Sequence, residues 1–252
     1  MNEIPLSINK ASYHYGPGGA GIDDIELQCL EGSWTAVMGP SGAGKSTLLY
    51  CASGLLPVSG GSICVSGHDI SKMHEKQLTQ MRRDHIGFVF QDYNLVEAFT
   101  CLQNVVLTHL FGGPAISEEQ AMHALQVVGL DGFADTYPSD MSGGQRQRVA
   151  IARSLAAEPD IVFADEPTGA LDTHSSQLVL DAIDRIVQEN RTVLMVTHDP
   201  NVAARAHRTL FLVDGHVHSV CEGYSNEQLA KELATITIVG QGLSQRKTKI
   251  LI

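Results

Sequence analysis

The segment GPSGAGKST, from Gly39 to Thr47, constrains the fold of this 252-residue chain more than any other feature. Its three glycines let the backbone turn successive N–H groups inward around an anion, where a Cβ would obstruct close approach. An apolar run, Trp34 to Met38, precedes the segment, and helix-forming residues from Ser46 to Leu56 follow it. The pattern predicts a strand, a phosphate-binding loop, and a helix whose positive N-terminal end faces the phosphates of a nucleoside triphosphate.

All nine residues of this loop are predicted nucleotide contacts: Gly39, Pro40, Ser41, Gly42, Ala43, Gly44, Lys45, Ser46 and Thr47. Lys45 is expected to reach the β- and γ-phosphates and so to act in catalysis. The Ser46 hydroxyl is expected to ligate Mg²⁺.

A second short apolar run, Ile161 to Ala164, ends in the acidic pair Asp165 and Glu166. The run is typical of a buried parallel strand, and carboxylates at its end face the crevice where open α/β sheets bind ligands. We expect Asp165 to hold Mg²⁺ through bound water. Glu166 is expected to polarise the attacking water as a general base.

Four further segments resemble the ATP-binding-cassette ATPases, and the resemblance covers the chain from about Leu6 to Gly215. MSGGQRQRVAIARSLA (141–156) resembles the signature motif and its helix, and DEPTGALD (165–172) resembles a Walker B strand with its D-loop. Gln91 in FVFQDYNL resembles the Q-loop glutamine, and His198 in VLMVTHD resembles the switch histidine. The resemblance implies that the nucleotide is ATP, with Mg²⁺, and that the chain hydrolyses it.

The family's mechanism implies a role for each matching residue. The signature residues would cap the γ-phosphate of a nucleotide held by a second copy, which makes a head-to-tail homodimer in the ATP-bound state. Gln91 would contact Mg²⁺ or water, His198 would contact the γ-phosphate and orient water with Glu166, and Asp172 would cross the interface. The signature contacts to nucleotide are Ser142, Gly143, Gly144 and Gln145.

The family also stacks an aromatic side chain on adenine. Tyr15, which lies 24 residues before Gly39, is the first choice, and Tyr13 is the alternative.

The predicted fold is α/β: a P-loop ATPase core with an antiparallel β edge subdomain and an inserted helical subdomain. Residues 1–220 would form a single domain, with the core at 1–92 and 160–220 and the helical insertion at 93–159. The insertion would contain a helix over 118–128 and the signature helix. Residues 221–252 would form a C-terminal helix and tail. There, a capping box at 225–228 would start a short helix to about Leu233, and ATITIV (234–239) reads as a possible strand.

Composition narrows the location and the partners. Seventeen Lys and Arg against 28 Asp and Glu give a net charge of −11, which disfavours nucleic acid as a partner. No apolar run approaches the roughly 18 residues of a membrane span, and the N-terminus lacks a secretory apolar core. Five scattered cysteines indicate reduced thiols. We therefore expect a cytoplasmic protein, peripheral at the cytoplasmic face of the cell membrane.

Segments from Phe88 to Val106, together with DEPTGALD and LFLVDGHV (210–217), resemble one cassette subfamily. Its members serve macrolide-export, lipoprotein-release, peptide-antibiotic-resistance and cell-division permeases. This implies a separate transmembrane permease docked beside Gln91, and a peptide, antibiotic, lipid-linked or similar export cargo. An apolar set is either permease contact or core of the insertion: Tyr93, Leu95, Val96 and Phe99.

Two other functions stay open at this point. One is a soluble cassette ATPase acting on nucleic acid, the ribosome or cofactor assembly. The other is a P-loop kinase or a binding module without hydrolysis, against which SGGQ (142–145), Glu166 and His198 argue. The sequence does not indicate the cargo or its direction of travel.

Overall fold

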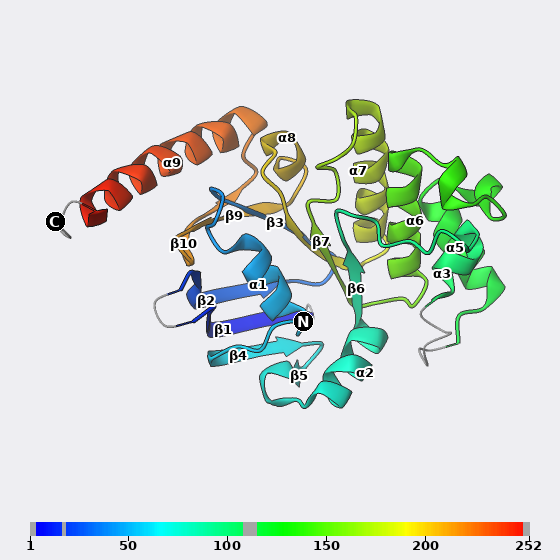
Figure 1. Cartoon of the computed structure of the whole chain (residues 1–252), viewed down its shortest axis with the longest axis horizontal. Coiled ribbons are helices and arrows are strands. Elements are labelled where there is room, and N and C mark those ends of the chain that lie inside the picture. The colour runs from blue at the N-terminus through cyan, green and yellow to red at the C-terminus, as the bar shows by residue number, and fades with distance from the viewer. Residues whose placement is uncertain (1–3, 17–18, 108–114, 249–252) are drawn as a thin grey trace.

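The computed structural model describes residues 4–16, 19–107 and 115–248, with side chains up to residue 237. Two sheets organise the chain, a six-stranded sheet in the order β10-β9-β3-β8-β7-β6 and a four-stranded sheet in the order β2-β1-β4-β5 (Figure 1). The strands are β1 (Leu6–His14), β2 (Gly21–Cys29), β3 (Trp34–Met38), β4 (Gly60–Val65), β5 (His68–Asp69), β6 (Ile86–Val89), β7 (Ile161–Asp165), β8 (Thr192–Val196), β9 (Arg208–Val213) and β10 (His216–Glu222).

Helices cover these sheets. They are α1 (Lys45–Ala52), α2 (Glu75–His85), α3 (Cys101–Val105), α5 (Glu118–Val127), α6 (Gly143–Leu155), α7 (Thr173–Gln188), α8 (Pro200–Ala203) and α9 (Asn226–Thr248), with 3₁₀ turns at Ile70–Lys72, Asp131–Phe133 and Pro138–Asp140. The predicted α/β class, with an antiparallel sheet beside a parallel core and a group of helices, is confirmed.

The six-stranded sheet is parallel from β9 to β6, and only its edge strand β10 runs antiparallel to its neighbour. Every residue of β3 and β8 is buried, as are the first four residues of β7. Strands covered on both faces lack the alternation of half-exposed strands, which is why they appear in the sequence as unbroken apolar runs. Because β3, β7 and β8 are parallel, the loops that follow them meet at one edge of the sheet.

The four-stranded sheet is antiparallel. β1 pairs with β2 on one side and with β4 on the other, and alternate β1 residues such as Leu6 and Ile8 are buried. They belong to one apolar cluster with Leu48 and Leu49 of α1. The sheet therefore backs the helix that follows the phosphate loop.

A group of helices lies on the other side of the molecule, where α6 packs against α3, α5 and α7 (Figure 1). Their contacts are apolar, with Leu125 of α5, Val149 of α6 and Ile183 of α7 in one buried cluster. α5 begins with a capping box formed by Ser117 and Gln120, close to the predicted start.

The prediction for the C-terminal segment was wrong beyond Leu233. The capping box is present, since Ser225 and Gln228 exchange hydrogen bonds. The helix it starts, α9, continues to Thr248 and leads away from the sheets, in place of a strand at 234–239 (Figure 1). The β-branched residues suggested a strand, but the Thr235 hydroxyl donates to the Lys231 carbonyl, four residues back. Leu229 and Ile236, seven residues apart, bury one face of the helix.

Within the described part of the chain, no helix is both long and apolar enough to cross a membrane.

The five cysteines are free thiols, and four of them are buried. Burial raises the pKa of Cys51 to about 12 and that of Cys101 to about 11. These thiols therefore stay protonated and pack as small apolar side chains, as the sequence predicts.

Candidate functional site

The phosphate loop joins β3 to α1 in a conformation that requires glycine at two positions. A Cβ on Gly39 would lie 2.1 Å from the Leu212 carbonyl oxygen. Gly44 has φ +98°, and a Cβ there would lie 2.5 Å from the Gly21 carbonyl oxygen. The loop is therefore packed closely against β9 and β2, and a side chain at either glycine would push it away.

A pocket of about 340 Å³ opens over this loop. Its lining includes eight of the predicted site residues: Tyr15, Ser41, Gly42, Gly44, Lys45, Ser46, Thr47 and Glu166. The loop residue Ala43 does not line the pocket, because its side chain is buried in the core. Residues far apart in the sequence thus meet around one cavity at the loop.

Tyr15 borders this pocket, with 61% of its surface exposed, and the Thr47 hydroxyl donates to its phenol oxygen at 3.3 Å. Tyr13 is half-buried, packs against the core of the antiparallel sheet, and meets Tyr15 edge-on at 5.0 Å. The position of Tyr15 at the pocket favours it over Tyr13 as the residue that stacks on a base. This assignment stays a prediction.

Lys45 is already held in place over the loop. Its Nζ donates to the carbonyl oxygens of Gly39 and Pro40, both at 2.9 Å. Burial lowers the pKa of Lys45, while the carboxylates of Glu166 and Asp165 act in the opposite direction. An ammonium has three donors, so one N–H remains for a phosphate oxygen.

The carboxylate of Asp165 is bonded through both of its oxygens to α1. Ser46 Oγ donates to Oδ1 at 3.3 Å, and Tyr50 Oη donates to Oδ2 at 2.9 Å. Burial and the hydrogen bond to Asp165 raise the pKa of Tyr50 to about 12, so the phenol remains a donor. Sequence reasoning missed Tyr50, although the spacing i, i+4 from Ser46 places both side chains on one helix face.

These oxygens fit Mg²⁺, which is usually bound by one or two carboxylates together with substrate phosphates and water. Ser46 and Asp165 supply a hydroxyl and a carboxylate beside the phosphate pocket. Among the described residues, no group of three or more His, Cys, Asp or Glu is placed to hold a metal ion by itself. A metal here would therefore need the nucleotide's own oxygens.

Glu166 and His198 form a contact pair at the ends of β7 and β8. The His198 Nδ1 lies 2.9 Å from Glu166 Oε2, with the imidazole side chain 69% exposed and the carboxylate side chain 18% exposed. Glu166 has a left-handed φ of +48°, and its N–H donates to the Val196 carbonyl. A non-glycine residue in this conformation is strained by about 1–3 kcal/mol, and such strain is common at functional sites.

Gln91 is exposed and lies beside the turn that follows Glu166, since a Cβ on Gly169 would be 3.5 Å from its Nε2. Among the described residues, no hydrogen bond joins Gln91 to Ser46 or Asp165. The predicted contact of Gln91 with Mg²⁺ stays a prediction.

The signature segment lies at the N-terminus of α6. Ser142 caps this helix by accepting from Gln145 N–H, and the Gln145 side chain accepts from Ser142 N–H. A Cβ on Gly144 would lie 2.5 Å from Ser175 Cβ, so α6 meets the start of α7 closely. Gly143 follows the cap and lies near the Tyr93 hydroxyl.

Asp172 caps the N-terminus of α7. It accepts from Ser175 N–H at 3.0 Å and from the Ser175 hydroxyl at 2.6 Å, and these bonds hold the pKa of Asp172 below its usual value. Asp172 and the signature segment therefore share one region. Within the part of the chain that the structure describes, no hydrogen bond connects that region to the phosphate loop.

Helix α6 also holds the segment on both sides of Gln91, through residues that the motif analysis did not assign. Gln147 is fully buried and its Nε2 donates to the Phe90 carbonyl. Arg153 donates to the carbonyls of Tyr93 and Asn94, two adjacent residues with left-handed φ values of +59° and +52°. Both lie inside the signature helix, but their partners are about 60 residues away, and sequence alone does not indicate that distance.

Comparison with known proteins identifies the family to which the chain belongs. The family model described as "ABC transporter" matches residues 22–169, which is more than half of the sequence. The chain belongs to the ABC transporter family. It is an ATP-binding cassette and an ATPase.

The cassette is 41% identical over 217 residues to the uncharacterized ABC transporter ATP-binding protein YvrO of Bacillus subtilis, covering 84% of this chain and 95% of that protein. It is 37% identical over 237 residues to the macrolide export ATP-binding/permease protein MacB of Mannheimia succiniciproducens. That match covers 90% of this chain but 37% of the relative, so the cassette spans about a third of the macrolide export protein.

Among solved structures, it resembles the ATP-binding cassette MJ0796 in a dimeric, post-hydrolysis state bound to ADP and Pi. The TM-score is 0.78 at 35% identity, over 87% of this chain and 99% of that one.

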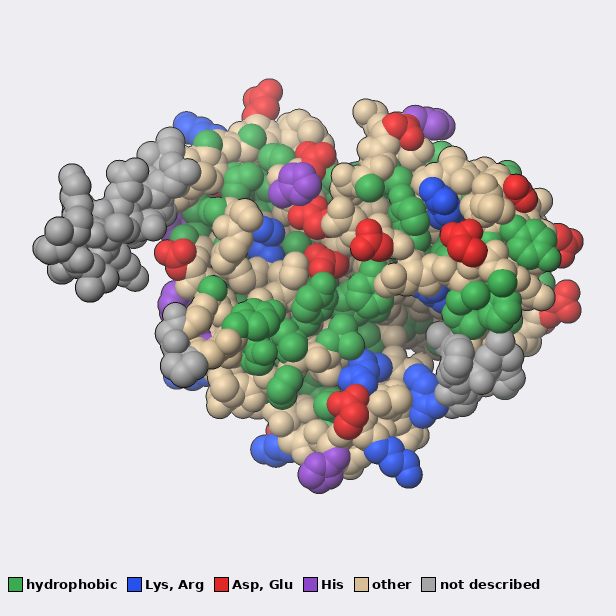
Figure 2. Space-filling view, in the orientation of Figure 1, with side chains coloured by type: hydrophobic (Ala, Val, Ile, Leu, Met, Phe, Trp, Pro, Cys, Tyr) green, Lys and Arg blue, Asp and Glu red, His purple; other side chains and the backbone are tan. Residues whose placement is uncertain are grey.

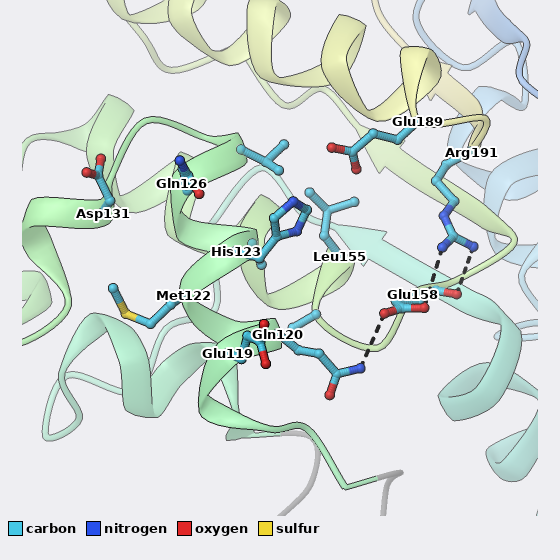
Figure 3. A pocket seen from close by; sticks show the side chains of 13 residues that line it. Glu119, Gln120, Met122, His123, Gln126, Asp131, Leu155, Glu158, Glu189 and Arg191 are labelled. Atoms are coloured by element: carbon cyan, nitrogen blue, oxygen red, sulfur yellow. Dashed lines mark hydrogen bonds and ion pairs between the residues drawn. The ribbon is translucent and has the colours of Figure 1, made fainter.

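A larger cavity of about 730 Å³ lies away from the phosphate loop of the cassette, between α5, the end of α6 and the turn before β8. Its lining is rich in carboxylates, among them Glu119, Glu158 and Glu189, together with His123 (Figure 3). Glu158 accepts from Gln120 and pairs with Arg191. None of the predicted site residues lines this cavity.

Proposed function

We propose that the cassette hydrolyses ATP to drive a separate transmembrane permease, and that it works as a head-to-tail dimer which closes around two ATP molecules. The observation that carries this proposal is the separation of two anion sites within one chain. The phosphate loop lies at the edge of the parallel sheet, while the N–H groups of the signature segment lie at the start of α6. In a two-fold arrangement, each signature segment faces the nucleotide of the other copy.

The geometry of the signature segment suits this role. The Ser142 oxygen is used as an acceptor in the helix cap, so its hydroxyl proton remains free to donate. The N-terminus of α6 presents the positive end of a 13-residue helix dipole. Both favour the charge of a γ-phosphate held by another subunit.

Hydrolysis is assigned to residues at the edge of the parallel sheet. Glu166 is proposed to accept a proton from the attacking water, and its hydrogen bond to His198 fixes the carboxylate in the left-handed turn. Lys45 would donate its remaining N–H to a phosphate oxygen. Ser46 and Asp165 would hold Mg²⁺, Gln91 is proposed as a further contact, and the metal when bound would neutralise charge on the phosphates.

The permease contact is assigned to a groove of about 430 Å³ between α1, α2 and the segment after β6. Its floor includes the stacked rings of Phe88 and Phe90, 4.1 Å apart, and the exposed Leu55. Arg82 and Arg153 are among its lining residues; Arg82 is paired with Glu75, and Arg153 donates to the carbonyls of Tyr93 and Asn94. Figure 2 displays hydrophobic side chains gathered over this region, with Lys and Arg toward α2. An amphipathic, acidic segment of a permease fits this surface.

Two of the four apolar residues after Gln91 differ in how far they are buried. Leu95 packs against the core of the helical part, whereas Val96 is 36% exposed. Of these two residues, Val96 is proposed as a permease contact and Leu95 as part of the core.

The names of the relatives support export as the direction of transport, because several of them are macrolide export proteins. We propose a peptide, an antibiotic or a lipid-linked molecule as the cargo, and a position at the cytoplasmic face of the cell membrane.

Dimerisation is tested with Glu166→Gln, which should keep ATP affinity, lose at least about a hundredfold in turnover, and accumulate the closed state. Column light scattering with and without Mg-ATP measures its size. A dimer that forms only with ATP supports the proposal. The control adds Ser142→Asp, which keeps a good helix cap but sets a carboxylate against the γ-phosphate, so the dimer should be lost. A dimer that survives this second change contradicts the signature assignment.

The permease contact is tested by binding of the purified chain to membranes from the cells that produce it. Binding should saturate and should be lost with Leu55→Glu in the groove. Val220→Glu makes the same change at another exposed apolar residue, 52% exposed on β10, and should leave binding intact. Equal binding by both variants would count against the groove.

A further inference from the structure

Tyr50 reaches the same carboxylate as Ser46 from the next turn of α1. The two residues are four apart on one helix, so their side chains lie on the same face. Ser46 Oγ is 3.3 Å from Asp165 Oδ1, and Tyr50 Oη is 2.9 Å from Asp165 Oδ2. The two bonds span 119 and 115 residues of sequence and tie the helix after the phosphate loop to the end of β7.

The two carboxylate oxygens of Asp165 lie against different residues. Oδ1 lies against Ser46, which lines the nucleotide pocket. Oδ2 lies against Tyr50, which is not part of that lining. A phenol has a single proton to give, and here that proton is directed to Oδ2. The two carboxylate oxygens therefore have different partners, with Oδ1 bonded to a residue that lines the pocket and Oδ2 bonded to one that does not.

The ring of Tyr50 is itself held in place. It is half-buried, and its centroid lies 6.1 Å from that of Phe88 on β6. Phe88 stacks in turn on Phe90 at 4.1 Å and on Phe163 at 6.3 Å. Because these rings fix the phenol, the hydroxyl does not have to be ordered when a ligand arrives.

We propose that Tyr50 is a positioning residue that holds the Asp165 carboxylate in the orientation required for Mg²⁺ on the bound nucleotide. This inference rests on the proposed roles of Ser46 and Asp165. It assigns a function to a residue outside the phosphate-loop pattern. The competing explanation is a hydrogen bond that only joins α1 to β7 and leaves the metal unaffected.

The two explanations differ in how affinity depends on Mg²⁺. The test uses Tyr50→Phe, which keeps the ring and removes the hydroxyl, and measures the Kd of fluorescent mant-ADP with saturating Mg²⁺ and with EDTA. The Kd in EDTA should stay within about twofold of the wild type, because Tyr50 does not line the pocket. The affinity gained from Mg²⁺ should fall by about tenfold, or 1.4 kcal/mol, since a bond to a charged group is lost.

Two controls make the outcome specific. Tyr137→Phe removes a hydroxyl from a tyrosine that is 45% exposed in the helical part, and it should change neither Kd. Ser46→Ala should lose the affinity gained from Mg²⁺, as the proposed function requires. Thermal melting without nucleotide checks that every variant is folded.

The outcomes separate the inference from the function on which it rests. If Tyr50→Phe keeps the full gain from Mg²⁺ while Ser46→Ala loses it, the role given to Tyr50 is wrong and the metal assignment stands. If Tyr50→Phe weakens binding equally with and without Mg²⁺, Tyr50 acts on the fold or the nucleotide, and the inference also fails. If Ser46→Ala keeps the gain, the proposed metal site is wrong.

Discussion

Asn104 is fully buried on α3 and holds the turn between Val96 and Thr100 through its side chain. Its Oδ1 accepts from Val96 N–H at 2.8 Å. Its Nδ2 faces the carbonyls of Val96, Phe99 and Thr100, at 3.1, 3.0 and 3.0 Å. Replacement by leucine keeps a similar volume and removes all of these bonds, so Asn104→Leu measures what the network contributes to stability.

The expected loss follows from which groups are left without a partner. Val96 O still accepts from Phe99 N–H, and Thr100 O still accepts from the backbone N–H of residue 104. Val96 N–H and Phe99 C=O lose the bonds that Asn104 gives them. A buried group without a partner costs about 1–3 kcal/mol, and because these two groups are only partly buried we take the lower half of that range for each, which gives about 3 kcal/mol together. In a chain of this size that lowers Tm by about 6–12 °C.

Urea unfolding and thermal melting followed by circular dichroism measure this loss. The matched control is Gln126→Leu, an amide-to-leucine change at an exposed position of α5, which should stay within about 0.5 kcal/mol. Nucleotide affinity should be unchanged in both variants, because neither residue lines the nucleotide pocket. A loss below about 1 kcal/mol in Asn104→Leu would refute the reasoning, since it would mean that water or relaxed backbone satisfies both groups.

Three further changes test other parts of the fold. Gly44→Ala should abolish ATP binding in a fluorescent-nucleotide titration, because its Cβ would lie 2.5 Å from the Gly21 carbonyl at a φ of +98°. Leu229→Ala, at a side chain of α9 that is 1% exposed, should lower the free energy of unfolding by about 2–5 kcal/mol in urea titrations. Arg205 donates to Asp181 and holds the pKa of that carboxyl below its usual value. The pair therefore stabilises the fold above about pH 4 and loses this effect as the pH falls through the lower folded-state pKa. Arg205→Gln should cost about 0.5–1 kcal/mol at pH 7, and the difference from wild type should shrink below pH 4 in pH-dependent unfolding.

The parts of the fold that sequence predicts well are those with local causes. The strand at 34–38 and the strand at 161–165 appear as unbroken apolar runs because both of their faces are covered. The phosphate loop is recognisable because its glycines are required by φ and by close backbone contacts. The capping boxes at Ser117 and Ser225 are encoded within four residues. In each case, the cause lies within a short window of sequence.

The predictions that failed depend on contacts between residues that are far apart in the sequence. ATITIV has the composition of a strand, but a helix already started at Asn226 continues through it, and in this helix the segment pairs with no strand of either described sheet. Residue 236 is buried in that helix against the cluster that contains Phe211. Tyr50 was missed for a related reason, since its partner Asp165 is 115 residues away. The i, i+4 spacing from Ser46 was visible, but it becomes informative only once the two elements are known to be adjacent.

The groups of the site are held by hydrogen bonds within the chain, and this bears on how ATP energy is used. Lys45 is tied to two loop carbonyls, both Asp165 oxygens are bonded to α1, and Glu166 is paired with His198. Little binding energy is then needed to arrange these groups, in line with the general advantage of preorganisation. Among the described residues, no hydrogen bond joins the signature segment to the phosphate loop of the same chain. If such a contact is made across the dimer, the energy of ATP binding goes into bringing two rigid sites together, and hydrolysis at Glu166 removes the group that joins them. The Glu166→Gln dimer and the Ser142→Asp control therefore test the step that converts nucleotide chemistry into motion.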